Sequence, residues 1–128
     1  MTPDPRILVV DDTPANVRLL EAVLGPRGYE MRTAGSGPEA LEAVTRDRPD
    51  LVLLDILMPG MDGYEVCRRL RADPSTAEIP IVILTAKAIA PEERERLAAH
   101  VAHLAAKASF SRAEFVELVR RLCGDRVA

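Results

Sequence analysis

The chain alternates short continuous apolar runs with segments whose apolar residues recur at helical spacing. Residues 6–10, 51–55 and 79–85 are nearly unbroken runs of Val, Ile and Leu. Runs of this length and composition are typical of strands buried on both faces of a sheet. Two weaker stretches, 29–33 and the alanine-rich 101–106, occupy equivalent places in the alternation. The pattern therefore predicts five strands.

The segments between these runs carry the start and stop signals of helices. Thr13 precedes Pro14 as an N-cap residue does, and Gly25 follows the last apolar position of the first helix. Ser36 opens the second helix in the same way. Further helices are predicted over 64–72, 91–99 and 111–122. The helix over 91–99 has a thin apolar stripe, so we expect it to be weakly held and mobile.

Strands that alternate with helices five times predict a parallel sheet covered on both faces by helices. We find no internal repeat and no linker, which predicts a single domain over residues 1–128. In such a sheet all carboxyl ends of the strands meet at one edge, where open α/β sheets bind their ligands. The residues expected to converge at this edge are Asp11, Asp12, Asp55, Thr85 and Lys107.

Composition narrows the function. The 128 residues carry a formal net charge of −3, which gives no electrostatic basis for binding nucleic acid. No apolar run approaches the ~20 residues of a membrane span, and the N-terminus lacks the plan of a signal peptide. Cys67 and Cys123 lie too far apart for a metal or redox motif. We therefore expect a cytoplasmic protein without direct nucleic-acid binding or membrane insertion.

The predicted edge has the chemistry of a phosphoryl site. Three clustered carboxylates repel each other unless a cation lies among them, and Mg²⁺ suits such an oxygen-rich site. Asp55, alone at its strand end, is the natural nucleophile toward phosphorus, with Asp11 and Asp12 holding the metal. The Thr85 hydroxyl and the Lys107 ammonium would face the oxygens of the transferred group.

Each of these residues also has a purely structural explanation. Asp55 could simply start the turn that follows its strand. Asp11 and Asp12 could be acids that cap the next helix. Thr85 could be a β-branched residue that ends a strand, and Lys107 a solvated terminus. It is the meeting of all of them at one edge that favours the functional interpretation.

These residues stand in motifs that resemble a known family. The segments 7–12 (ILVVDD), 53–63 (LLDILMPGMDG) and 84–86 (LTA), together with Lys107, are similar to the receiver domains of bacterial two-component response regulators. The first half is most similar to the receivers that precede diguanylate cyclase domains. The resemblance implies the chemotaxis-regulator-like fold: a five-stranded, doubly wound parallel sheet, flavodoxin-like, with strand order 2-1-3-4-5 and helices on both faces.

The resemblance also implies roles for individual residues. Asp55 would accept a phosphoryl group from a phosphohistidine on a histidine kinase or phosphotransfer protein. Thr85 would hydrogen-bond this group and Lys107 would pair with it, shifting the conformation around Thr85 and the fourth helix. The implied Mg²⁺ ligands are Asp11, Asp12, Asp55 and the backbone carbonyl of Leu57. Beyond self-phosphorylation and self-dephosphorylation at Asp55, no enzymatic activity is implied.

The sequence departs from the family pattern close to Lys107. Ala108 stands where the family usually has a proline, and Leu104 stands where it usually has the aromatic residue that switches rotamer. Cis peptide bonds are essentially a proline feature, so we expect this loop to run trans. The departures put the usual readout through the fourth helix and fifth strand in question, not the chemistry at Asp55.

Two other functions compete with the phosphorylated switch. A degenerate receiver would act only as a protein-interaction domain, but such members commonly lose an acid or the lysine, and here all are present. The other is an aspartyl-phosphate phosphatase. Enzymes of this kind carry a second Asp, the acid-base, two residues after the nucleophile, and this chain has Leu57 at that position. The sequence does not specify the cognate kinase, the downstream protein target or whether the chain forms a homodimer.

Overall fold

The structure is a computed structural model that describes residues 5–55, 63–85, 103–106 and 112–123. Its strands are β1 (Arg6–Val10), β2 (Glu30–Ala34), β3 (Leu51–Asp55), β4 (Ile81–Thr85) and β5 (His103–Ala106). Its helices are α1 (Pro14–Leu24), the 3-10 turn η1 (Gly25–Arg27), α2 (Gly37–Arg46), α3 (Gly63–Ala72) and α5 (Arg112–Leu122). The helix predicted over 91–99 lies outside the described residues.

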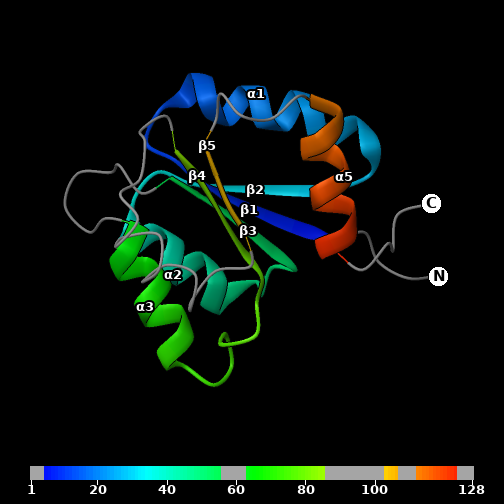
Figure 1. The fold of residues 1–128 in the computed structure, drawn as a ribbon. Helices are drawn as coiled ribbons and strands as arrows, with labels where there is room; N and C mark the ends of the chain where they lie inside the picture. Colours follow the sequence, from blue (N-terminus) through cyan, green and yellow to red (C-terminus); the bar gives the residue numbers. More distant parts are fainter. Residues whose placement is uncertain (1–4, 56–62, 86–102, 107–111, 124–128) are drawn as a thin grey trace.

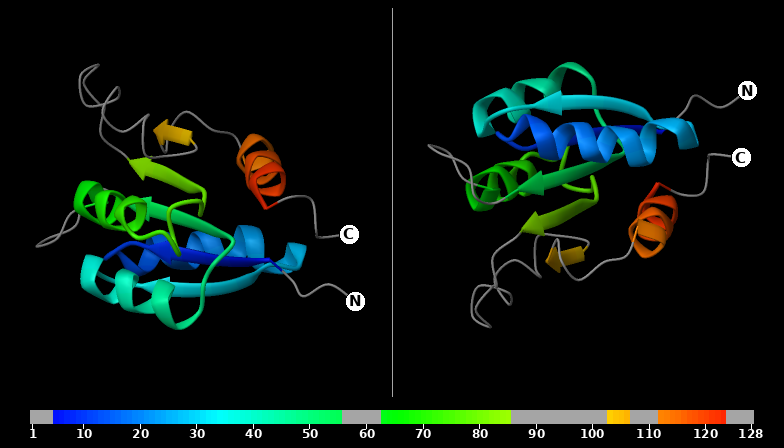
Figure 2. Two further views of the ribbon diagram at one scale, coloured as in Figure 1. Left: turned by 90° about the horizontal axis from the view of Figure 1, so that it is seen from below. Right: turned by 90° about the horizontal axis from the view of Figure 1, so that it is seen from above.

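All the strands run parallel in one sheet with the order β2-β1-β3-β4-β5. Helices α1 and α5 cover one face of this sheet, and α2 and α3 cover the other (Figure 1). Figure 2 shows the two helical layers from opposite sides. The prediction of a flavodoxin-like α/β fold, with a parallel sheet and helices on both faces, is confirmed.

Successive residues of the inner strands pack alternately into two separate hydrophobic cores, one on each face of the sheet. On one face Leu8, Val52 and Ile81 belong to the cluster beneath α2 and α3. On the other face Val9, Leu53 and Val82 join residues of α1 and α5, among them Leu24, Phe115 and Val119. All five residues of β3 are buried. The unbroken apolar runs in the sequence follow from this burial, because a sheet covered on both faces leaves no solvent-facing position.

α1 and α2 begin at the N-cap residues that the sequence predicts, Thr13 and Ser36, but only one of them caps through its side chain. Thr13 is the N-cap of α1, yet its side chain makes no capping hydrogen bond. At α2 the Ser36 hydroxyl accepts the Glu39 N–H at 3.3 Å, and the Glu39 carboxylate accepts the Gly35 N–H at 3.0 Å. This pair resembles a capping box, except that Glu39 accepts from the residue before the N-cap rather than from the N-cap N–H itself. It orders the connection between β2 and α2.

α1 ends at Leu24 with Gly25 as its C-cap, as the sequence predicts. Gly25 has right-handed φ and ψ of −54° and −49°, and the chain continues into η1. The left-handed conformation falls instead on Gly28, with φ of 95°, whose N–H bonds back to the Gly25 carbonyl at 3.2 Å. Pro26 fits the first turn of η1, where no N–H donor is needed. The left-handed residue therefore lies three positions after the C-cap of α1. No helix within the described ranges is long and apolar enough to cross a membrane.

Candidate functional site

Two acids lie side by side because of the register between β1 and β3. Val10 pairs with Leu54 across these strands. The next residues, Asp11 and Asp55, therefore emerge together at the carboxyl edge of the sheet. Asp11 is 5% exposed and Asp55 is 8% exposed, so both carboxylates are largely withdrawn from solvent.

Asp12 completes the cluster from the exposed side. One carboxylate oxygen from each of Asp11, Asp12 and Asp55 lies within 4.8 Å of the others. The three predicted acids thus come together, with two of them buried and one reached by solvent. Like charges at this separation repel, and the repulsion is stronger where the surroundings exclude water.

Backbone groups hold the turn that carries these acids. The Asp11 carboxylate accepts the N–H of Thr13 at 2.9 Å, and the Asp11 N–H donates to the Ala34 carbonyl at 3.1 Å. The first contact fixes the carboxylate at the start of α1, and the second ties the end of β1 to the end of β2. Asp11 is therefore positioned before any ligand binds.

The donor set fits a hard divalent cation. All three ligands are carboxylate oxygens, which Mg²⁺ prefers, and the small number of protein ligands leaves room for water in an octahedral shell. The described part of the cluster contains neither histidine nor cysteine, the ligands that zinc sites favour. The chemistry of the cluster thus matches the predicted Mg²⁺ site.

The other predicted site residues are placed only in part. Asp55 pairs with Leu84 in the register between β3 and β4, so the backbone of Thr85 lies one residue beyond that pair, at the same edge. Thr85 in turn pairs with Ala106 of β5. Leu57, Lys107 and Ala108 lie outside the described residues, and their predicted roles stay predictions.

A cavity of about 280 Å³ opens beside the acids. It lies between the start of α1 and the end of β2, and its lining comprises Asp11, Asp12, Pro14, Val17, Arg18, Thr33, Ala34 and Gly35. Arg18 is the one cationic residue in this described lining. Sequence reasoning missed Arg18, because the cavity that it shares with Asp11 and Asp12 forms only when α1 packs against the end of β2.

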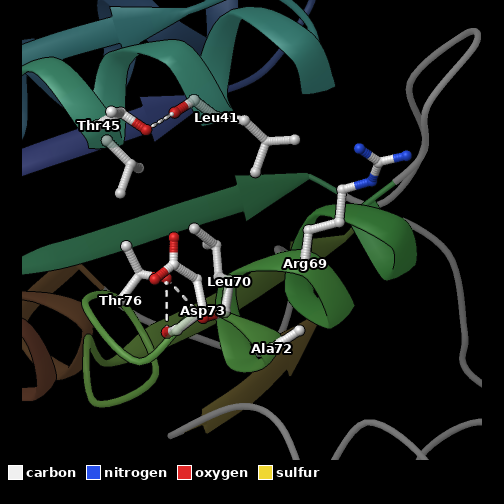
Figure 3. A pocket seen from close by; sticks show the side chains of 8 residues that line it. Leu41, Thr45, Arg69, Leu70, Ala72, Asp73 and Thr76 are labelled. Carbon is white, nitrogen blue, oxygen red and sulfur yellow. Dashed lines mark hydrogen bonds between the residues drawn. The ribbon is translucent and has the colours of Figure 1, made fainter.

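A second cavity, of about 360 Å³, separates α2 from α3 (Figure 3). Its charged groups are already engaged: Arg69 donates to Glu65 at 2.9 Å, and Asp73 accepts from the Ser75 N–H and hydroxyl at 2.9 Å. In Figure 3 Thr45 bonds within its own helix, to the Leu41 carbonyl. None of the three acids lines this cavity, so it is separate from the site.

Comparison with known proteins identifies the family. Residues 7–120 match the response regulator receiver domain. The chain therefore belongs to the receiver domains of the response regulators of two-component signalling. Receivers of this family are phosphoacceptors rather than enzymes, and they bind Mg²⁺ at an acidic site.

Individual relatives agree with this assignment. The response regulator PleD of Caulobacter vibrioides is 60% identical over 81 residues, which are 63% of this chain and 18% of PleD. The chain thus corresponds to less than a fifth of that relative. A putative response regulator from Chloroflexus aurantiacus J-10-fl has a similar structure, with a TM-score of 0.85 and 37% identity over 94% of this chain and 98% of that one.

A third relative bears on the metal. The receiver domain of the sensor histidine kinase PA1611 from Pseudomonas aeruginosa PAO1 has a TM-score of 0.83 and 34% identity. The alignment covers 94% of this chain and 98% of that one. That structure has a magnesium ion coordinated in its active-site cleft.

Proposed function

We propose that this chain is a phospho-accepting switch in which Asp55 receives a phosphoryl group from a histidine kinase or phosphotransfer protein. The observation that carries the proposal is the meeting of Asp11, Asp12 and Asp55, with their oxygens within 4.8 Å, at the carboxyl edge of the sheet. Asp55 ends a fully buried strand, so its position is rigidly defined. A fixed nucleophile suits phosphoryl transfer, which depends mainly on positioning and charge neutralisation.

In the proposed reaction a carboxylate oxygen of Asp55 attacks the phosphorus of the donor. The bond from phosphorus to the imidazole nitrogen breaks, and its electron pair leaves with the imidazole. When bound, Mg²⁺ would neutralise charge on the carboxylates and on the phosphoryl oxygens. Asp11, Asp12, Asp55 and the Leu57 carbonyl would hold it. Thr85 would bond a phosphoryl oxygen and Lys107 would pair with another.

The proposal extends to the fate of the phosphoryl group. Water hydrolyses the acyl phosphate slowly, so the switch resets itself without a separate enzyme. Recruitment of Thr85 toward the phosphoryl group changes the populations of two conformations, which a partner protein then distinguishes. In this scheme residues 1–128 act as one domain. The protein works in the cytoplasm. The pure interaction domain has less support, since the acids needed for chemistry are all retained.

The test is phosphorylation by a small donor. The wild-type protein is incubated with acetyl phosphate and Mg²⁺, and the intact protein is weighed by mass spectrometry. We expect the mass of one phosphoryl group to be added to wild type and not to Asp55→Asn. Asp47→Asn removes an exposed carboxylate at the end of α2 and serves as the matched control. An unmodified wild type, or an Asp55→Asn variant that gains the same mass, would contradict the proposal.

A further inference from the structure

Arg18 lies on the wall of the cavity that opens beside the acids. Pro14 and Arg18, one helical turn apart on α1, both line this cavity, and so do Asp11 and Asp12. Arg18 is exposed, and within the described part of the chain no hydrogen bond or ion pair engages it. An arginine at this place brings a permanent positive charge beside two of the three clustered acids, since Asp11 and Asp12 line the cavity and Asp55 does not.

We propose that Arg18 is a selectivity residue for the phosphoryl donor, favouring donors with more negative charge at the acidic site. The inference rests on the proposed function of Asp55. It adds a residue that no motif of the chain singles out, and it concerns small phosphoryl compounds rather than a protein partner.

The physical reason is the balance of charge at the entrance. Three carboxylates repel an incoming phosphate, and the metal offsets only part of that charge when it is bound. A guanidinium in the cavity next to Asp11 and Asp12 attracts phosphoryl oxygens and presents donors in a planar fork that matches them. Arg18 is exposed, so the attraction is screened by salt with a Debye length of about 10 Å at 0.1 M.

The same charge acts on the metal in the opposite direction. A guanidinium that lines the same cavity as Asp12 repels a divalent cation that approaches the carboxylates. Removal of the Arg18 charge should therefore strengthen Mg²⁺ binding while it slows the entry of an anionic donor. A residue whose role was only to stabilise α1 would not give these opposed effects.

The test compares two donors in charge-matched variants. Acetyl phosphate carries more negative charge at neutral pH than phosphoramidate does. Arg18→Ala and Arg27→Ala each remove one exposed arginine, but Arg27 lies in η1, beyond the far end of α1. An 11-residue helix places that end about 16 Å from Pro14. Phosphorylation rates are measured by intact mass at low and high NaCl, and Mg²⁺ affinity by calorimetry.

We expect Arg18→Ala to lower the rate with acetyl phosphate about three-fold, the scale of an exposed charge interaction. The rate with phosphoramidate should fall less, and the difference should shrink at high salt. Arg18→Lys should keep most of the selectivity, while Mg²⁺ affinity should rise in Arg18→Ala only. If the ratio of the rate with acetyl phosphate to the rate with phosphoramidate is the same in Arg18→Ala and Arg27→Ala, the inference is overturned. A wild type that neither donor phosphorylates would instead refute the proposed function.

Discussion

Asp11 and Asp55 follow directly on Val10 and Leu54, which face each other across β1 and β3. This one register brings acids separated by 44 residues into a cluster whose oxygens lie within 4.8 Å. A shift by one residue would exchange the side chains of a strand between the two cores, each packed against its own pair of helices, so the packing protects the register. The site thus depends on the packing of the sheet beneath it.

The first prediction concerns the metal. Asp12→Asn keeps the size of the side chain but removes one of three carboxylate charges. We expect its Mg²⁺ affinity, measured by calorimetry, to fall about ten-fold or more, since each ten-fold step in a dissociation constant corresponds to about 1.4 kcal/mol. Without metal, we expect the variant to melt about 2–4 °C higher than wild type, because one repulsion is relieved.

The control for this variant is Glu78→Gln, which removes an exposed acid just before the start of β4. It should leave both the Mg²⁺ affinity and the melting temperature close to those of wild type. Mg²⁺ should also raise the melting temperature of wild type and Glu78→Gln more than that of Asp12→Asn. An unchanged metal affinity in Asp12→Asn would remove Asp12 from the ligand set.

A second prediction tests the core beneath the acids. Leu54 is fully buried next to Asp55. Leu54→Ala should lower the free energy of unfolding in urea by about 2–5 kcal/mol, because a cavity forms where no neighbour can collapse completely. Leu19, 57% exposed on α1, is the matched control. Leu19→Ala should change this free energy by no more than about 0.5 kcal/mol.

A third prediction concerns Arg71, which joins α3 to the segment before β4. Its guanidinium donates to the Ala77 and Ile79 carbonyls at 2.8 and 2.7 Å. Arg71→Met keeps the apolar stem and loses both contacts, so the free energy of unfolding should fall by about 1–3 kcal/mol. Arg68→Met removes an exposed arginine from the same helix and should cost less than about 1 kcal/mol. Equal losses in the two variants would contradict this role for Arg71.

A fourth prediction concerns pH. The Ser75 N–H, and then its hydroxyl, lower the pKa of Asp73 below its usual 3.8. A lowered folded-state pKa gives stability that is present above the unfolded pKa and lost as the pH falls through the folded one. Asp73→Asn should therefore be less stable than wild type at pH 7, with the gap closing below about pH 4.

The cause of this shift can be tested by NMR titration of the Asp73 carboxyl. Ser75→Ala removes the hydroxyl and keeps the backbone N–H, which is the larger cause. The pKa of Asp73 should rise in Ser75→Ala but stay below 3.8. A pKa that does not move would show that the hydroxyl contributes nothing.

Much of the fold was predictable because local signals agree with the packing. The continuous runs that form β1, β3 and β4 indicate burial on both faces, and these strands lie inside the sheet. The capping signal at Ser36 is realised by its hydrogen bond with Glu39. Gly25 ends α1 as predicted, but the sequence did not reveal the 3-10 turn η1 that follows it and places the left-handed conformation at Gly28.

The sequence by itself determined the order of elements and the residues that follow each strand, since hydrophobic period and turn residues act over a few positions. From this, the convergence of Asp11, Asp12 and Asp55 could be predicted. Only the tertiary structure decided their separation, the burial of two of them and the cavity that Arg18 shares with Asp11 and Asp12. The separation and burial depend on strand register, which joins acids 44 residues apart in the chain, and the cavity depends on the packing of α1 against the end of β2; no local pattern encodes either.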